Sequence, residues 1–257
     1  MTAFARCPNG FNKHVYDGNT YCISKRYKSK QMKDLNAKYL QKYPKGTPYV
    51  MAVQDDNMED LDLFLEHDAM QQDFQVNVLG KDRFGNCATP YSRAISRGNF
   101  NMVEDMQNSE PGLSSPDLTV LCDEKENYLH KAASAVTERK LGDNMKILEM
   151  LVNPSKVFGD VELALKAEQE DGYNPLEMAI AAGYFDRALV LFNAKSPIRQ
   201  KSLLILQGGL YADSLNQIQH FETFLKTVTG GLKTTSVLNA QNKDCLLYTS
   251  DAADEGH

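Results

Sequence analysis

The chain has 257 residues, of which 42% are hydrophobic and 24% are charged. These fractions are typical of a folded protein with an apolar core, and they exclude a disordered chain. No apolar run reaches the roughly 18 residues that a membrane-spanning helix needs, and the N-terminus lacks the basic and then apolar order of a secretory signal. We therefore expect a cytoplasmic protein without a transmembrane segment.

Charge is distributed unevenly along the chain. Residues 1–46 carry ten Lys or Arg and two Asp, a net charge of +8. The whole chain has 28 basic and 34 acidic residues, so residues 47–257 carry 18 and 32, a net charge of −14. A basic segment of this kind can bind nucleic acid or an anionic membrane surface, or it can dock onto the acidic body of its own chain.

The N-terminal segment predicts a small cap made of a β-hairpin and a helix. Asp17-Gly18 is a strong turn dipeptide, and residues 14–16 and 20–23 flank it as two short strands. Residues 29–43 follow with the apolar spacing of a basic amphipathic helix. The side chains expected on its inner face are Met32, Leu35, Tyr39 and Leu40.

Four later segments share one pattern that predicts the start of a helix. Each begins with Thr or Asn, which suits the N-cap, and an Ala follows five residues later. Three of the four continue with Pro, which suits the first helical position. The segments begin at Thr47-Pro48, Thr89-Pro90, Asn127-Tyr128 and Asn174-Pro175.

Each predicted helix is followed by a second one with apolar residues at three-residue steps. Gly98 and Gly183 supply the turn between the two helices in the second and fourth segments. A helical hairpin of this kind buries its apolar stripe only against a neighbouring copy. The stripes are Met58, Leu61, Phe64; Phe100, Val103, Met106; Met145, Leu148, Leu151; and Phe185, Ala188, Leu191.

The four segments resemble ankyrin repeats, whose consensus is Thr-Pro-Leu-His-x-Ala. The consensus is matched at Thr89-Pro90 with Ala94, at Leu129-His130 with Ala132 and at Pro175-Leu176 with Ala179. The resemblance implies an all-α fold, an ankyrin-like α-solenoid of helical hairpins with long inter-repeat loops. It divides the chain into a basic hairpin and capping helix (1–46), four divergent repeats (47–192), an atypical C-terminal helical pair (193–231) and a tail (232–257).

Several features depart from regular ankyrin repeats. Long insertions at 71–83, 108–126 and 154–170 separate the hairpins, where ankyrin proteins carry finger loops. Asp56 and Val136 stand where glycine is expected, so we expect those two turns to differ from the others. Residues 245–255 resemble a translated transposase-type sequencing adapter, and we exclude them from reasoning about the fold.

The resemblance also implies a function, because proteins of this family mostly recognise other proteins with finger loops and the concave face. We therefore expect a protein–protein interaction module or scaffold, with binding residues on loops held by a rigid stack. The alternative is a nucleic-acid or anionic-surface tether through residues 1–46. The candidate partner-binding residues, chosen as exposed polar or aromatic positions, are Asp82, Arg83, Phe84, Asn86, Tyr91, Arg93, Asp171, Tyr173 and Glu177.

Two further expectations depend on the same resemblance. It implies that His130, at the histidine position of the consensus, is a structural residue. Divergent repeats with long inserts also resemble those of effectors from intracellular bacteria and of large DNA viruses, which implies the cytosol of a host cell.

The sequence contains no pattern that predicts catalysis. Phosphate-binding glycine loops, nucleophile elbows, zinc-protease motifs and calcium loops are all missing, so we expect no enzyme activity, no cofactor and no metal site. Cys7 and Cys22 favour two free thiols packed in the hairpin, with a disulfide or a zinc site completed by His14 as alternatives. The acidic run from Asp55 to Asp62 favours a solvated helix face.

Overall fold

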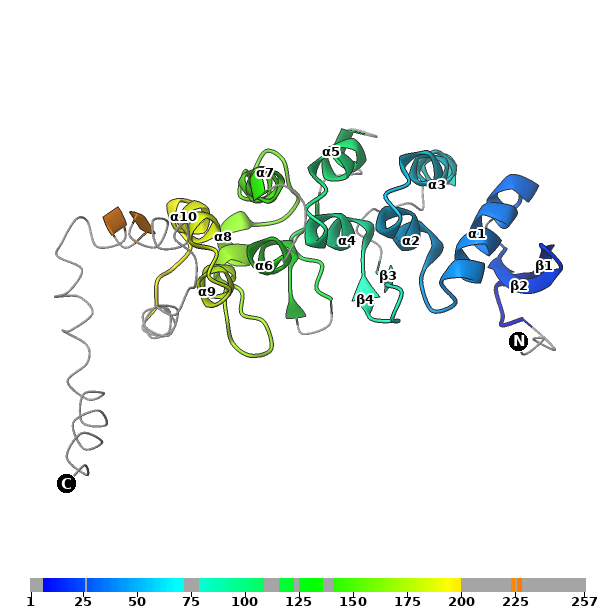
Figure 1. The fold of residues 1–257 in the computed structure, drawn as a ribbon, viewed down its shortest axis with the longest axis horizontal. Helices are drawn as coiled ribbons and strands as arrows, with labels where there is room; N and C mark the ends of the chain where they lie inside the picture. The colour runs from blue at the N-terminus through cyan, green and yellow to red at the C-terminus, as the bar shows by residue number, and fades with distance from the viewer. Residues whose placement is uncertain are drawn as a thin grey trace, which may run out of the picture.

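The computed structural model describes residues 7–25, 27–71, 79–108, 116–122, 125–135, 141–199, 223–224 and 226–227. Within these ranges the chain forms ten helices and two antiparallel two-stranded sheets, so the fold is mostly α with a small β cap at the N-terminal end (Figure 1). None of the helices in this part of the chain is long and apolar enough to cross a membrane.

The N-terminal cap is built as the sequence predicts. Strands β1 (Phe11–Tyr16) and β2 (Asn19–Ser24) pair around Asp17 and Gly18, which have φ angles of 47° and 71°. Two left-handed residues in a two-residue loop give the turn whose twist matches an antiparallel hairpin. Helix α1 (Lys30–Lys42) begins after Ser29, whose hydroxyl accepts a hydrogen bond from the amide of Met32.

Four helical hairpins follow in chain order and lie in a row (Figure 1). Successive first helices contact each other, as do the second helices α5, α7 and α10. The hairpins are α2 (Pro48–Gln54) with α3 (Met58–Gln71), α4 (Pro90–Ser96) with α5 (Phe100–Asn108), α6 (Tyr128–Ser134) with α7 (Leu141–Leu151), and α9 (Pro175–Ala181) with α10 (Phe185–Asn193).

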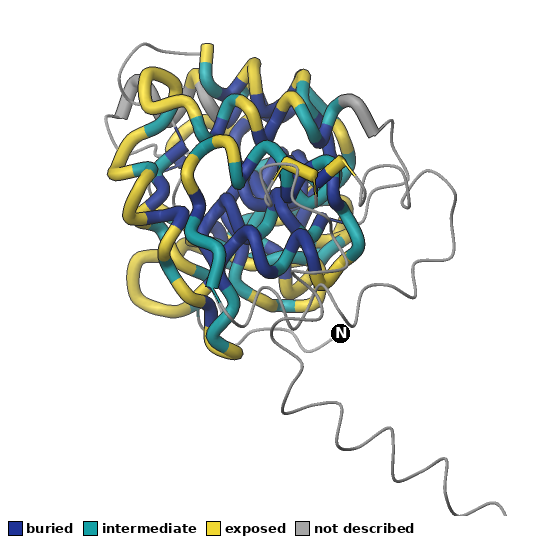
Figure 2. Tube along the Cα trace, turned by 90° about the vertical axis from the view of Figure 1, so that its left-hand side faces the viewer, coloured by how far each residue is buried: buried dark blue, intermediate teal, exposed yellow. Residues whose placement is uncertain are grey.

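The predicted apolar stripes form the core of this row. The second and third members of every stripe are buried, and the first members are buried or half-buried. Figure 2 shows the buried residues running through the middle of the molecule with exposed residues around them. The helices, their starting positions and their inner faces are therefore confirmed.

Inserts separate the hairpins. We call the segments before α4, before α6 and before α9 the first, second and third inserts; their described parts are residues 79–88, 116–122 with 125–126, and 152–173. The first insert contains the short strands β3 (Gly80–Lys81) and β4 (Cys87–Ala88), and the third contains helix α8 (Val161–Lys166), which was not predicted.

The cap residues Thr47 and Thr89 connect one hairpin to the next. The Thr47 hydroxyl accepts a hydrogen bond from the amide of Lys81 in the first insert at 2.8 Å. Gly80 passes so close that a Cβ there would lie 2.8 Å from this hydroxyl. The buried Thr89 hydroxyl accepts from the amide of Ser92 at 2.9 Å and bonds the Tyr128 hydroxyl of the next hairpin at 2.9 Å.

Asn127 and Asn174 repeat this arrangement with amide side chains. Each side-chain oxygen accepts a hydrogen bond from the third residue of its own helix. The Asn127 amide nitrogen donates to the carbonyl of Ala164 at 3.0 Å, and that of Asn174 donates to the carbonyl of Pro197 at 3.4 Å. The cap row, Thr47, Thr89, Asn127 and Asn174, therefore joins local helix starts to the next part of the chain.

The turn at Asp56 corrects one expectation. Asp56 has a φ of 59°, as Gly98 has 61° and Gly183 has 75°, so the first turn has the same left-handed form as the glycine turns. Aspartate tolerates this conformation better than most residues. Its carboxylate also accepts a hydrogen bond from the Asn99 side chain in the next turn.

The C-terminal end of helix α6 is capped by an arginine from another hairpin. The Arg187 side chain is 1% exposed, and its Nη1 donates to the carbonyls of Ala132, Ala133 and Ala135 at 3.2, 3.2 and 2.8 Å. Its guanidinium lies 3.9 Å from the ring centroid of Tyr184. A cation at this position satisfies carbonyls that lack partners inside the helix and opposes the negative end of its dipole.

Several expectations fall partly or wholly outside the described residues. The turn at Val136 and the tail 232–257, with its adapter-like residues 245–255, are outside them. Of the predicted C-terminal pair, residues 193–199 and four positions near Phe224 are described. The buried Phe224 ring lies 6.4 Å from that of Phe185 and 6.3 Å from that of Phe192, so this segment packs on α10.

Replacing Arg187 with methionine should lower the free energy of unfolding by about 3 kcal/mol, because three buried carbonyls lose a charged donor. Urea unfolding monitored by circular dichroism measures the change. Arg83→Met, at an exposed arginine, is the matched control and should stay within about 0.5 kcal/mol of the wild type. Equal losses in both variants would show that Arg187 does not cap α6.

Candidate functional site

The tip of the first insert presents three of the predicted partner-binding residues. Arg83, Phe84 and Asn86 are exposed, and Phe84 is 63% exposed. The Asp82 carboxylate accepts hydrogen bonds from the amides of Phe84 and Asn86 at 2.8 and 3.0 Å. The Arg83 guanidinium lies 4.5 Å from the Phe84 ring centroid. Asp82 is half-buried and therefore shapes the tip rather than standing out from it.

Tyr91 is a correction, because it is completely buried rather than exposed. Its ring packs against that of Tyr128 with centroids 5.9 Å apart. The position after the helix-starting proline points between neighbouring first helices, so an aromatic residue there belongs to the core. Arg93, two positions further on, is half-buried and lines a surface groove between α4 and α6.

The third insert separates the remaining candidates. Asp171 is exposed and Tyr173 is half-buried. Glu177 is completely buried, so its expected exposure is wrong. Its carboxylate accepts a hydrogen bond from the backbone amide of Asn174 at 3.0 Å and forms an ion pair with Arg199. Glu177 is the third residue of α9, where a carboxylate completes a capping box.

His130 has the structural role that the resemblance implies. The side chain is completely buried, its Nδ1 accepts a hydrogen bond from the Asn127 amide at 3.3 Å, and its Nε2 donates to the Tyr173 carbonyl at 3.1 Å. It therefore connects α6 to the third insert. Burial lowers the pKa of His130, because the charged imidazolium loses its hydration.

Exposed hydrophobic side chains are concentrated in the inserts. Among the described residues, the large hydrophobic side chains that are exposed lie in the three inserts or in the N-terminal hairpin, and not in the four helical hairpins. Those in the inserts are Leu79, Phe84, Leu121, Phe158 and Leu163. Sequence reasoning selected only Phe84 from this set.

The basic N-terminal helix α1 forms ion pairs with the acidic run after α2. Asp60 is 9% exposed and accepts from the Lys38 ammonium at 2.5 Å and the Tyr39 hydroxyl at 2.8 Å. Asp55 pairs with the Lys42 ammonium at 2.7 Å. The expected solvated face is therefore wrong at these two aspartates. Of the three interpretations of the basic segment, docking onto the chain's own acidic body is the one seen here.

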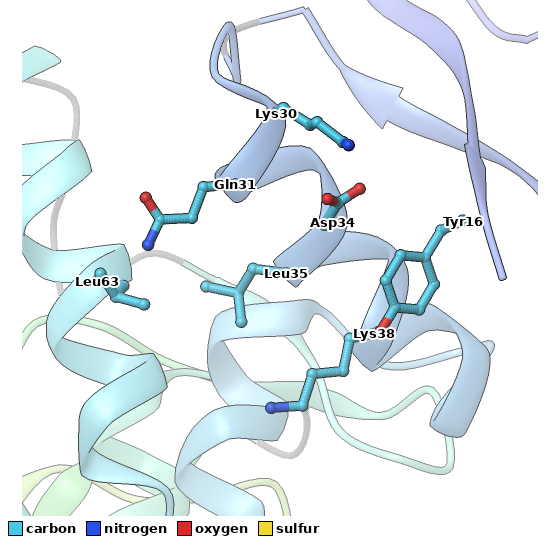
Figure 3. A pocket seen from close by; sticks show the side chains of 7 residues that line it. All are labelled: Tyr16, Lys30, Gln31, Asp34, Leu35, Lys38 and Leu63. Atoms are coloured by element: carbon cyan, nitrogen blue, oxygen red, sulfur yellow. The ribbon is translucent and has the colours of Figure 1, made fainter.

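A pocket of about 490 Å³ lies where this helix meets its neighbours (Figure 3). Tyr16 comes from β1 and Leu63 from α3, and the other lining residues, Lys30, Gln31, Asp34, Leu35 and Lys38, belong to α1. Two of its charged groups already have partners, since Asp34 pairs with His14 at 2.7 Å and Lys38 pairs with Asp60. The pocket therefore belongs to the docked N-terminal cap.

Four cysteines form two disulfides, which corrects the expectation of free thiols. Cys7 bonds Cys22 beside the N-terminal hairpin, and Cys87 of the first insert bonds Cys122 of the second. The Cys7–Cys22 bond leaves no thiolates for the alternative zinc site with His14. Disulfides persist mainly in oxidising compartments, which does not favour the expected cytoplasmic location. The even count of cysteines before residue 245 was the signal available in the sequence.

The disulfide between the inserts contributes to two hollows on the surface. One is a groove of about 290 Å³ lined by Asp82, Asn86, Cys87, Ala88, Ser92, Arg93, Ser96, Cys122 and Lys131. The other, of about 770 Å³, is lined by Thr47, Leu79, Gly80, Lys81, Gly85, Cys87, Leu121 and Cys122. The first is polar and basic, and the second includes two exposed leucines.

Comparison with known proteins adds no family to this description. No protein-family model matches the chain, and no curated protein is significantly similar to it. Among the described residues, no group of three or more His, Cys, Asp or Glu is placed to hold a metal ion.

The Cys87–Cys122 bond should stabilise the chain by about 3 to 4 kcal/mol, because it closes a loop across 35 positions in the unfolded chain. Cys87→Ser should lower the free energy of unfolding by this amount under oxidising conditions. The wild type in reductant loses both disulfides, and the control Cys7→Ser loses only Cys7–Cys22. Comparing their free energies of unfolding with that of Cys87→Ser separates the contributions of the two bonds. Equal stability of Cys87→Ser and the oxidised wild type would contradict the bond.

His130 should make stability depend on pH below neutrality. Its pKa is lowered in the folded chain, whereas the unfolded chain binds a proton near the ordinary value of about 6.5. As pH falls below about 6.5, the free energy of unfolding should therefore decrease by up to about 1.4 kcal/mol per pH unit. His130→Gln should reduce this slope between pH 7 and 5, as measured by urea unfolding; an unchanged slope would assign it to other groups.

Proposed function

We propose that this chain is an ankyrin-like α-solenoid that binds another protein through its inserts and the first helices beside them. The observation that carries the proposal is that, among the described residues, five of the seven exposed large hydrophobic side chains lie in the inserts. Apolar groups exposed on rigid supports mark surfaces where proteins associate, because association removes them from water. Four hairpins in a row, three of them with a first helix capped by the side chain of Thr89, Asn127 or Asn174, support the solenoid part of the proposal.

The inserts are held in place before a partner binds. Asp82 closes the tip of the first insert, and the Cys87–Cys122 bond ties it to the second. The Thr47 hydroxyl and the Lys81 amide attach the base of the first insert to α2. Preorganised loops lose little conformational entropy on association, which favours binding through these segments.

A tether through residues 1–46 is the less favoured function. Its lysines at positions 38 and 42 pair with Asp60 and Asp55 of the same chain, so they are less available to phosphates. A tether would lose affinity steeply with salt, because each neutralised phosphate releases counterions. Binding through the inserts would depend much less on salt.

The proposed interaction module has neither a catalytic role nor a cofactor. A cytoplasmic location, including a host cytosol, belongs to the same proposal. Since the two disulfides persist best in oxidising conditions, binding has to be measured both with and without reductant.

The variant Phe84→Ser with Leu121→Ser should lose most partner binding, because both side chains are exposed in neighbouring inserts. The full chain is used to capture proteins from lysate, and mass spectrometry quantifies them at low and high salt. We expect at least a tenfold loss with unchanged thermal unfolding.

The matched control is Phe11→Ser with Val15→Ser, which removes two exposed apolar side chains from the N-terminal hairpin. This control should bind like the wild type. Equal binding by both double variants would remove the inserts from the interface, and binding lost only with salt or nuclease would favour the tether.

A further inference from the structure

The groove of about 290 Å³ contains two basic side chains from neighbouring first helices. Arg93 follows the cap residue Thr89 by four positions, and Lys131 follows Asn127 by the same number. Because α4 contacts α6, equivalent positions on the two helices face the same groove. Arg97 lies one helical turn beyond Arg93.

Arg93 and Arg97 differ from Arg187 and Arg199, whose guanidinium groups have hydrogen-bond acceptors. The Nε atoms of both are buried without a hydrogen-bond partner, as is the Nε of Arg187. Within the described ranges, no hydrogen bond or ion pair involves either guanidinium, whereas Arg187 binds three carbonyls and Arg199 binds Glu177. Burial and the neighbouring Arg97 lower the pKa of Arg93. A buried donor without an acceptor is costly. Of the two arginines, Arg93 lines the groove, and an anion there would offer its guanidinium an acceptor.

Two acidic groups bear on the groove: Asp82, which lines it, and Glu126, which pairs with the lining residue Lys131. Asp82 accepts hydrogen bonds from the amides of Phe84 and Asn86, and Glu126 pairs with Lys131. Neither carboxylate neutralises the two arginines by direct contact. The groove therefore keeps an excess of positive charge while presenting two carboxylates near its walls.

This balance favours a carboxylate over a phosphate as the ligand. A guanidinium binds a planar carboxylate through two parallel hydrogen bonds. Arg93, Arg97 and Lys131 exceed Asp82 and Glu126 by one positive charge, which a carboxylate balances, whereas a phosphate group with nearly two negative charges would leave the groove net negative. The small volume admits a side chain rather than a folded domain, and the exposed Asn86 at the rim adds an amide.

We propose that the groove between α4 and α6 binds an Asp or Glu side chain of the partner protein, with Arg93 as the bidentate donor. The proposal rests on the proposed function and specifies the chemistry of the partner. The second hollow, with Leu79 and Leu121, shares the lining residues Cys87 and Cys122 with the groove. A segment that crosses their disulfide would place an acidic residue beside an apolar one.

The test titrates the full, oxidised, ¹⁵N-labelled chain with three probes. These are acetyl-Leu-Glu-Leu-amide, the isosteric acetyl-Leu-Gln-Leu-amide, and inorganic phosphate. The Nε–Hε resonance of Arg93 reports binding directly. We expect saturable shifts with the Glu peptide, a Kd at least tenfold higher for the Gln peptide, and weaker binding of phosphate than of the Glu peptide.

Variants locate the site on the chain. Arg93→Gln should raise the Kd of the Glu peptide at least tenfold, and Arg93→Lys should raise it less because one charge is kept without the bidentate geometry. The control Lys13→Gln removes one positive charge at an exposed position of the N-terminal hairpin and should leave the Kd unchanged. Thermal unfolding checks that each variant is folded, and Arg93→Lys carries the comparison if Arg93→Gln unfolds.

Three results would overturn the proposal: equal Kd values for the Glu and Gln peptides, an unchanged Kd in Arg93→Gln, or phosphate binding more tightly than the Glu peptide. The proposed function fails separately. If the Phe84 and Leu121 variant captures partners normally while the Glu peptide binds at Arg93, the carboxylate site stands without the insert interface. If capture needs the inserts but Arg93→Gln captures normally, the interface stands and the carboxylate site falls.

Discussion

The arrangement of the chain depends on one recurring interaction, the hydrogen bonds made by the cap row. Each cap side chain satisfies a free amide, either at the start of its own helix or in the next insert, and Thr89, Asn127 and Asn174 also reach the following part of the chain. These three caps are almost completely buried, where an unsatisfied amide or hydroxyl would be costly. At Thr89, Asn127 and Asn174, local helix initiation and long-range register are therefore set by the same side chain.

The cap at the N-terminal end combines apolar and ionic contacts. Tyr27, Tyr39 and Tyr49 surround the buried Phe64 ring at centroid distances of 6.2 to 6.5 Å, and the Lys38–Asp60 pair lies at the edge of this cluster. Exposed ion pairs contribute little, but Asp60 is largely shielded from water and also accepts from Tyr39. The uneven charge of the sequence thus has an internal use, in closing one end of the apolar core.

Much of the helical framework could be predicted because its signals are local. Thr89 starts a helix through its own hydroxyl, and apolar spacing identifies the buried face. The candidate site was harder, because exposure is decided by neighbours distant in sequence. Tyr91 is buried by Tyr128, and Glu177 is buried by Arg199, which no local pattern reveals. The pairing of Cys87 with Cys122 likewise depends on how two inserts approach each other.

The position of Arg187 determines how the chain can be divided. This residue belongs to α10 in the fourth hairpin, yet the carbonyls it binds lie at the C-terminal end of α6 in the third hairpin. A fragment ending between α7 and α9 would keep α6 but lose the cation at its C-terminal end. The third and fourth hairpins are therefore coupled through this contact, and a fragment meant to keep the end of α6 intact has to include α10.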